Sequence, residues 1–148
     1  MPDERSEVSP PEEETVIEYH GAKFRVVHCR GAMDSFDAAL KHCQKGKANS
    51  LRRGMEQQIA RLADGHRMSK ENFPSEGDLP KLSGHTSAKK FNALKRKPIR
   101  GYCWLSEKYL NTYFISHYIY KDFQKLNSKD TDRVASNWKR IEVDEDEF

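Results

Sequence analysis

Three segments with β-strand character follow one another between residues 89 and 120, and they constrain the fold more than any other feature. Residues 111–120 give the strongest signal, because tyrosine, phenylalanine and isoleucine dominate them. Residues 89–97 and 99–106 come before, with Pro98 at the turn between them and residues 107–110 as the next connection. Strands joined by such short connections pair antiparallel, so an antiparallel sheet is expected here.

Helical patterns occupy other parts of the chain. We predict helices over residues 34–46, from about 50 to 65, and from 127 or 128 to 141, with Asp, Asn or Ser at their starts. Each has apolar residues three or four positions apart, which face a core. These residues are Phe36, Leu40 and Cys43 in the first helix, Leu51, Met55, Ile59 and Leu62 in the second, and Val134, Trp138 and Ile141 in the last.

The remaining segments complete one α+β domain over residues 15–142. Residues 16–19 and 24–27 are short β-prone segments that allow a hairpin, and residues 66–88 lack periodicity and indicate a long loop. The expected order is β-α-α-β-β-β-α, with a mainly antiparallel sheet. Residues 1–14 have the composition of a disordered acidic tail, and residues 143–148 form a second acidic tail.

Charge is distributed unevenly along the 148 residues. Residues 1–18 and 142–148 together hold twelve of the 23 acids and one of the 26 lysines and arginines, so the body between them carries about +14. Residues 81–100 alone contain seven bases and no acid. Such a body attracts a polyanion, and nucleic acid is the polyanion that we expect.

Other classes of protein are disfavoured. The N-terminus has no apolar stretch of the kind found in secretory signals, and no apolar run is long enough to span a bilayer, so we expect a cytoplasmic protein. Three widely spaced cysteines (Cys29, Cys43 and Cys103) suit free thiols. The adjacent pairs His28-Cys29 and His42-Cys43 diverge on a strand or helix, so we expect no metal and no other cofactor.

Basic and aromatic side chains on the three consecutive strands suit RNA chemistry. Metal-free cleavage needs a base for the ribose 2′-hydroxyl, cations for the phosphate and an acid for the leaving 5′-oxygen. Histidine, arginine and lysine supply these functions, and aromatic rings stack on bases. The candidates are Lys95, Arg96, Arg100, His117, Tyr118, Lys121 and Lys125.

The stretch from Lys81 to Glu142 resembles the C-terminal half of the RelE/HigB toxins, including their phage-related branch. The resemblance rests on Leu82-Ser83-Gly84, Lys90 to Lys95, Ile99 to Trp104, Tyr113 to Tyr118, the lysines of the following turn, and Trp138 to Ile141. It implies a RelE-like fold and a ribosome-dependent endoribonuclease that cleaves mRNA and is neutralised by an antitoxin. The implied partners are therefore mRNA, the ribosome and an antitoxin protein, with a toxin–antitoxin hetero-oligomer.

The resemblance also implies roles for residues. Arg100 corresponds to the family's phosphate-binding arginine, His117 to a catalytic histidine of some members, and Lys95 and Lys121 to cations of the site. We add Lys89, Lys90, Arg96, Lys97, Tyr118 and Lys125 as RNA-binding residues.

The sequence departs from the family in three ways, one of which is that the 66–88 loop and both acidic tails lie outside the family's common core. The last helix has no catalytic Tyr or His, and Gly101 stands where an apolar residue is usual. A non-catalytic nucleic-acid-binding or regulatory module on the same scaffold therefore remains an alternative. A protein-interaction domain whose basic face binds an acidic partner is a third possibility.

Overall fold

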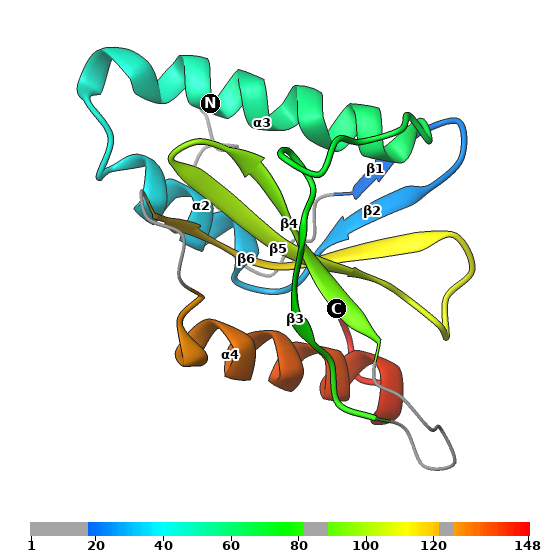
Figure 1. Ribbon diagram of the computed structural model, residues 1–148. Helices are drawn as coiled ribbons and strands as arrows, with labels where there is room; N and C mark the ends of the chain where they lie inside the picture. Colours follow the sequence, from blue (N-terminus) through cyan, green and yellow to red (C-terminus); the bar gives the residue numbers. More distant parts are fainter. Residues whose placement is uncertain (1–17, 82–88, 122–125) are drawn as a thin grey trace, which may run out of the picture.

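The computed structural model describes residues 18–81, 89–121 and 126–148, which form an α+β fold around a six-stranded sheet (Figure 1). The strand order is β1-β2-β6-β5-β4-β3. β2 and β6 pair in parallel and the other neighbours pair antiparallel. The strands are β1 (Glu18–His20), β2 (Arg25–His28), β3 (Ser75–Asp78), β4 (Lys90–Arg96), β5 (Ile99–Leu105) and β6 (Thr112–Tyr120). The predicted α+β class is confirmed.

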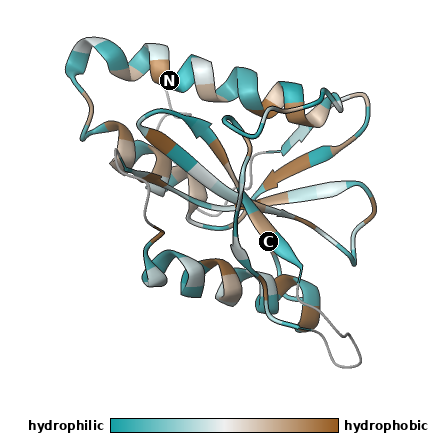
Figure 2. Cartoon of the chain, in the orientation of Figure 1, coloured by the Kyte–Doolittle hydropathy of each residue, from teal (hydrophilic) through white to brown (hydrophobic). Residues whose placement is uncertain are grey.

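Helices cover both faces of the sheet. The two upstream helices, α2 and α3, pack on one face, and α4 packs on the other (Figure 1). Figure 2 shows hydrophilic and hydrophobic residues interspersed along α3 and α4, as expected for helices with one face on a sheet and one in solvent. The helices are α2 (Ala32–Leu40), α3 (Ala48–Ala63) and α4 (Ser128–Trp138), with a 3₁₀ turn at Lys45–Lys47 and a π-helical turn at Lys139–Val143.

Two apolar clusters lie on opposite faces of the sheet. Phe36, Met55 and Ile59 pack with Leu94 and Ile115 on the α2/α3 face. The cluster on the α4 face is more aromatic: it consists of Val27, Cys29, Leu79, Phe91, Ala93, Tyr102, Trp104, Phe114, Val134, Trp138 and Ile141. Phe91 and Ala93 of β4 are fully buried there.

Helix boundaries differ most from prediction at α2. It begins at Ala32 rather than Asp34, and its cap is Gly31, whose φ of 87° lies in the left-handed region that glycine adopts most readily. It ends at Leu40, and the 3₁₀ turn then contains Gly46, the predicted stop. The cap of α4 is as predicted, because the Asn127 side chain accepts a hydrogen bond from Lys129 N at 2.8 Å.

The prediction of one long loop over residues 66–88 is wrong in part. Ser75–Asp78 forms edge strand β3, which pairs antiparallel with β4. This strand is polar and has no apolar alternation, so its backbone pairing leaves no signal in the sequence. The N-terminal hairpin does form between β1 and β2. The predicted disorder of residues 1–14 concerns positions outside the described residues.

The C-terminal residues pack against the domain. Trp104 Nε1 and Ser106 Oγ donate to the Glu142 carboxylate at 3.1 and 2.6 Å, and the backbone N–H groups of Glu107 and Lys108 donate to its other oxygen. The Phe148 ring contacts the rings of Tyr109 and Phe114. No helix in the described ranges has the length and apolar character needed to cross a membrane.

Candidate functional site

Three of the predicted site residues converge at one end of the sheet, on the face that carries α4. Lys95 of β4 and Arg100 of β5 are register partners across their hairpin, and Lys121 directly follows β6. Lys121 N donates to Pro98 O at 2.8 Å, which brings Lys121 to the turn between β4 and β5, beside the Lys95–Arg100 pair. Only 4% of Arg100 and 5% of Lys121 is exposed. We call Lys95, Arg100 and Lys121 the cationic cluster.

A β-bulge in β6 brings Lys121 to this face. Tyr102 pairs with His117 and Cys103 pairs with Ile115, so Ser116 is an extra residue in β6. Strict alternation from Phe114, which belongs to the α4-face core, would point His117 and Lys121 toward α2 and α3. The extra residue reverses this alternation, as bulges do. His117 and Lys121 therefore share a face with Arg100.

A second bulge adds a carboxylate that the sequence did not reveal. On β3, Ser75 pairs with Asn92 and Gly77 with Phe91, so Glu76 is the extra residue. Its Oε1 lies 3.6 Å from Arg100 Nη1, and its side chain is 11% exposed. A Cβ on Gly77 would lie 2.9 Å from the Phe91 ring, so close packing beside the bulge requires glycine.

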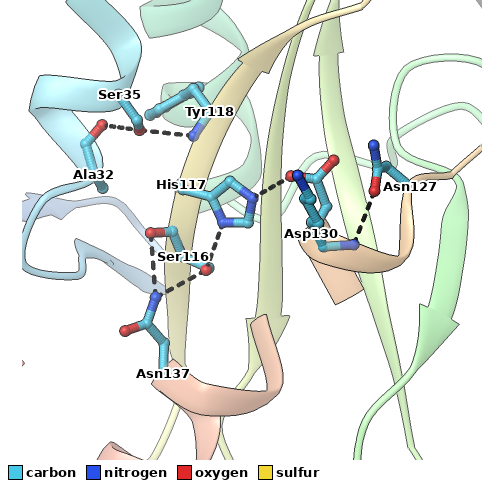
Figure 3. Close-up of polar contacts among 9 residues, drawn as sticks. Ala32, Ser35, Ser116, His117, Tyr118, Asn127, Asp130 and Asn137 are labelled. Atoms are coloured by element: carbon cyan, nitrogen blue, oxygen red, sulfur yellow. Dashed lines mark hydrogen bonds and ion pairs between the residues drawn. The ribbon is translucent and has the colours of Figure 1, made fainter. Parts of the chain in front are cut away.

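His117 is enclosed beside the cationic cluster and has partners at both ring nitrogens (Figure 3). Nε2 lies 3.0 Å from Asp130 Oδ1 at the start of α4, and Nδ1 lies 2.8 Å from Ser116 Oγ. Asn137 Nδ2 donates to the same Ser116 oxygen at 2.9 Å. Because a carboxylate only accepts, Nε2 carries the proton and Nδ1 accepts from the Ser116 hydroxyl in the neutral ring.

Burial favours this neutral ring. It lowers the pKa of His117, and Arg133 nearby acts in the same direction, whereas the bond to Asp130 opposes the shift. His117 is fully buried and both nitrogens are occupied, so this arrangement leaves neither nitrogen for a substrate. Through its Nε2, the His117 side chain instead holds the Asp130 carboxylate of α4 in place against the sheet.

Charge in this region is unbalanced toward the positive. Burial lowers the pKa of both Lys95 and Lys121, and the neighbouring Arg100 guanidinium lowers each further. Burial also raises the pKa of Tyr102 to about 12, so its hydroxyl stays neutral. Among the described residues, the carboxylates of Glu76, Asp130 and Glu71 act on these cations, and Lys97 adds a further positive charge beside Lys95. An arriving anion would relieve the repulsion, so the site suits a phosphate group.

A basic groove adjoins the cluster on the α3 side. It has a volume of about 660 Å³ and shares Lys95 with the cluster. Its other cations are Lys47 directly before α3, Arg61 in the last turn of α3, and Arg96 and Lys97 at the β4–β5 turn, with Glu71 as the acidic residue of the lining. The predicted RNA-binding residues Arg96 and Lys97 are exposed there. A groove with four surplus positive charges can follow a phosphodiester backbone.

The other predicted RNA-binding residues do not join the cluster. Lys89 and Lys90 lie at the opposite end of β4, and Lys90 is about 17 Å from Lys95 along the strand. They form ion pairs with Glu107 at 2.9 Å and Asp78 at 2.6 Å. Lys125 lies outside the described residues.

Tyr118 is buried on the opposite face of the sheet, so its predicted role in stacking on RNA bases does not fit this structure. Its ring stacks on Phe36 with centroids 4.3 Å apart, and its hydroxyl lies 2.7 Å from His28 Nε2. A Cβ on Gly101 would lie 2.7 Å from the Tyr118 ring. The glycine that departs from the family pattern therefore makes room for this ring.

Metal-binding groups are not assembled in the described part of the chain. No group of three or more His, Cys, Asp or Glu side chains is placed to hold a metal ion there. All three cysteines are free, and burial raises the pKa of the Cys29 thiol to about 12.

Sequence reasoning missed Glu76, Ser116 and Asn137, and it gave Asp130 only a helix-start role. The helix role holds, because Asp130 lies in the first turn of α4. The contact between Asp130 and His117 depends on how α4 crosses the sheet. Glu76 had no signal at all, since it lies in a polar segment that resembles a loop.

Comparisons with known proteins gave no relative. No family model matches the chain, and neither a curated protein nor a solved structure matches it significantly.

Proposed function

We propose that the chain is a RelE/HigB-type toxin, a cytoplasmic endoribonuclease that cleaves ribosome-bound mRNA without metal and is neutralised by an antitoxin. The observation that supports this best is the convergence of Lys95, Arg100 and Lys121 beside a carboxylate, next to a basic groove. Elements β2-α2-α3-β4-β5-β6-α4 also follow the order that the resemblance implies, with β1 and β3 added at the edges.

In this proposal the ribose 2′-oxygen attacks the adjacent phosphorus and the 5′-oxygen leaves. Arg100, Lys95 and Lys121 hold the phosphate and neutralise the charge that develops on its oxygens. The groove lined by Arg96 and Lys97 takes the neighbouring phosphodiester backbone. His117 has a positioning role through Asp130, because its own nitrogens are occupied.

The proposal is tested by inducible expression of the wild type, Lys95→Gln and Lys90→Gln in bacteria. The two variants lose the same charge on the same strand, but only Lys95 belongs to the cationic cluster. We expect the wild type and Lys90→Gln to arrest growth and create new mRNA ends within reading frames, and Lys95→Gln to do neither. Soluble wild-type protein that leaves growth and mRNA ends unchanged would refute the proposed endoribonuclease activity.

A non-catalytic RNA-binding module is the second candidate. The enclosure of His117 favours it, as does the lack of Tyr or His between residues 128 and 141. Such a module would bind RNA with an affinity that falls steeply with salt, and it would leave the RNA intact.

A further inference from the structure

Glu76 has a position that an ion-pair role alone does not explain. Its carboxylate comes from an edge strand, yet it is almost enclosed beside the innermost cation, Arg100. It lies close enough to Lys95, Lys121 and Tyr102 to affect the pKa of all three. The bulge at Glu76 and the close contact of Gly77 with Phe91 fix this orientation. A carboxylate held among cations at a phosphate site can accept a proton from a bound hydroxyl.

The order of the groups across the sheet also fits an in-line displacement. β3 carries Glu76 on one side, β5 carries Arg100 in the middle, and Lys121 follows β6 on the other side. In-line attack needs a proton acceptor and a proton donor on opposite sides of the phosphorus. His117 has partners at both ring nitrogens and Asp130 is hydrogen-bonded to it, whereas the Glu76 carboxylate lies 3.6 Å from the Arg100 guanidinium, where a bound phosphate would sit.

We propose that Glu76 is the general base of RNA cleavage, a role that rests on the proposed function. Glu76 takes the proton from the 2′-hydroxyl as the 2′-oxygen forms its bond to phosphorus. The bond from phosphorus to the 5′-oxygen breaks, and the ammonium group of Lys121 gives that oxygen a proton. The products are a 2′,3′-cyclic phosphate and a 5′-hydroxyl; Glu76, now protonated, loses its proton to water, and Lys121, now neutral, regains a proton from water.

A different role for Glu76 predicts an opposite result. If its carboxylate only occupied the place of the phosphate, removing its charge would strengthen RNA binding and speed cleavage. If it is the base, removing its charge leaves binding intact or stronger but slows the chemical step. The direction of the rate change therefore separates the two roles.

The experiment measures single-turnover cleavage of mRNA on programmed ribosomes by the full-length wild type, Glu76→Gln, Glu76→Asp and the control Asp78→Asn. Asp78 lies on the same strand and its exposed carboxylate pairs with Lys90, so the control makes the same charge change outside the cluster. Binding is measured with mRNA that carries a 2′-deoxy nucleotide at the cleavage position. Thermal unfolding verifies that each variant is folded.

We expect Glu76→Gln to cleave about 10²- to 10⁴-fold more slowly than the wild type, which is the usual range for losing a general base. Binding of the 2′-deoxy mRNA should be unchanged or tighter, and Asp78→Asn should cleave at the wild-type rate. Glu76→Asp should recover part of the rate.

Two results would overturn the assignment. A folded Glu76→Gln variant that cleaves as fast as the wild type, or faster, would exclude Glu76 as the base while leaving the endoribonuclease intact. A wild type that binds the ribosome-bound mRNA but never cleaves it would remove the proposed function and the role of Glu76 with it.

Discussion

Glu142 should stabilise the whole domain, although it lies in the acidic C-terminal segment. Its carboxylate accepts four hydrogen bonds, from the Trp104 indole, the Ser106 hydroxyl and two backbone N–H groups. Trp104 is fully buried, so without the carboxylate its N–H would lose its partner in a place closed to water. The backbone donors belong to exposed residues and can bind water instead.

The expected cost of Glu142→Ala follows from these contacts. An unsatisfied buried donor costs about 1–3 kcal/mol, and loss of the charge-assisted bond to Ser106 adds to it, so we expect a total of about 2–4 kcal/mol. At about 3 °C per kcal/mol for a domain of this size, the midpoint of thermal unfolding should fall by about 6–12 °C. Glu142→Gln should show a smaller fall, because one oxygen remains to accept.

Thermal unfolding followed by circular dichroism measures this effect. The control is Glu145→Ala, which removes an exposed carboxylate three residues later that pairs with Lys108. We expect the control to change the midpoint little, because exposed ion pairs contribute little to stability. Equal thermal midpoints for Glu142→Ala and Glu145→Ala would show that the four hydrogen bonds to Glu142 do not stabilise the domain.

Two further positions in the sheet can be tested, Gly101 and His117. Gly101→Ala should lower the free energy of unfolding by about 1–3 kcal/mol, because its Cβ would lie 2.7 Å from the Tyr118 ring. The control Gly46→Ala meets no atom within 4 Å and should leave this free energy unchanged, and urea titration compares the two variants. Burial lowers the pKa of His117 below its unfolded value, so the unfolded chain binds protons more readily and stability should fall as pH drops from about 7 to 5. His117→Gln should weaken that dependence in the same titrations, and an unchanged slope would contradict the pKa shift.

The sequence predicted well those elements whose side chains carry the signal. Tyr113 to Tyr120 combine aromatic and β-branched residues, and they form the central strand β6. The stripe of Met55, Ile59 and Leu62 identified α3, and Asn127 marked the start of α4 through a local hydrogen bond. In each case the residues that determine the element lie within it or directly beside it.

The features that the sequence did not predict depend on contacts between segments that are distant in the chain. β3 is held by pairing with β4, and its residues Ser75–Asp78 have neither apolar alternation nor β-branched side chains. The bulge at Ser116 decides which face receives His117 and Lys121, yet a bulge has no residue pattern of its own. The sequence therefore indicated that Arg100, Lys95 and Lys121 belong together, but not that Glu76 joins them or that His117 is enclosed.

The parallel pairing of β2 with β6 has a consequence for the order of folding. Residues 25–28 pair with residues 112–115, so residues 29–111 lie between the two partners. Closing so long a loop is entropically unfavourable, and it yields contacts only once β6 has been synthesised. β6 lies between β2 and β5 in the sheet, so the β1–β2 hairpin cannot join β3, β4 and β5 until β6 has been synthesised. We therefore expect a nascent chain to lack its cationic cluster until synthesis has passed Lys121.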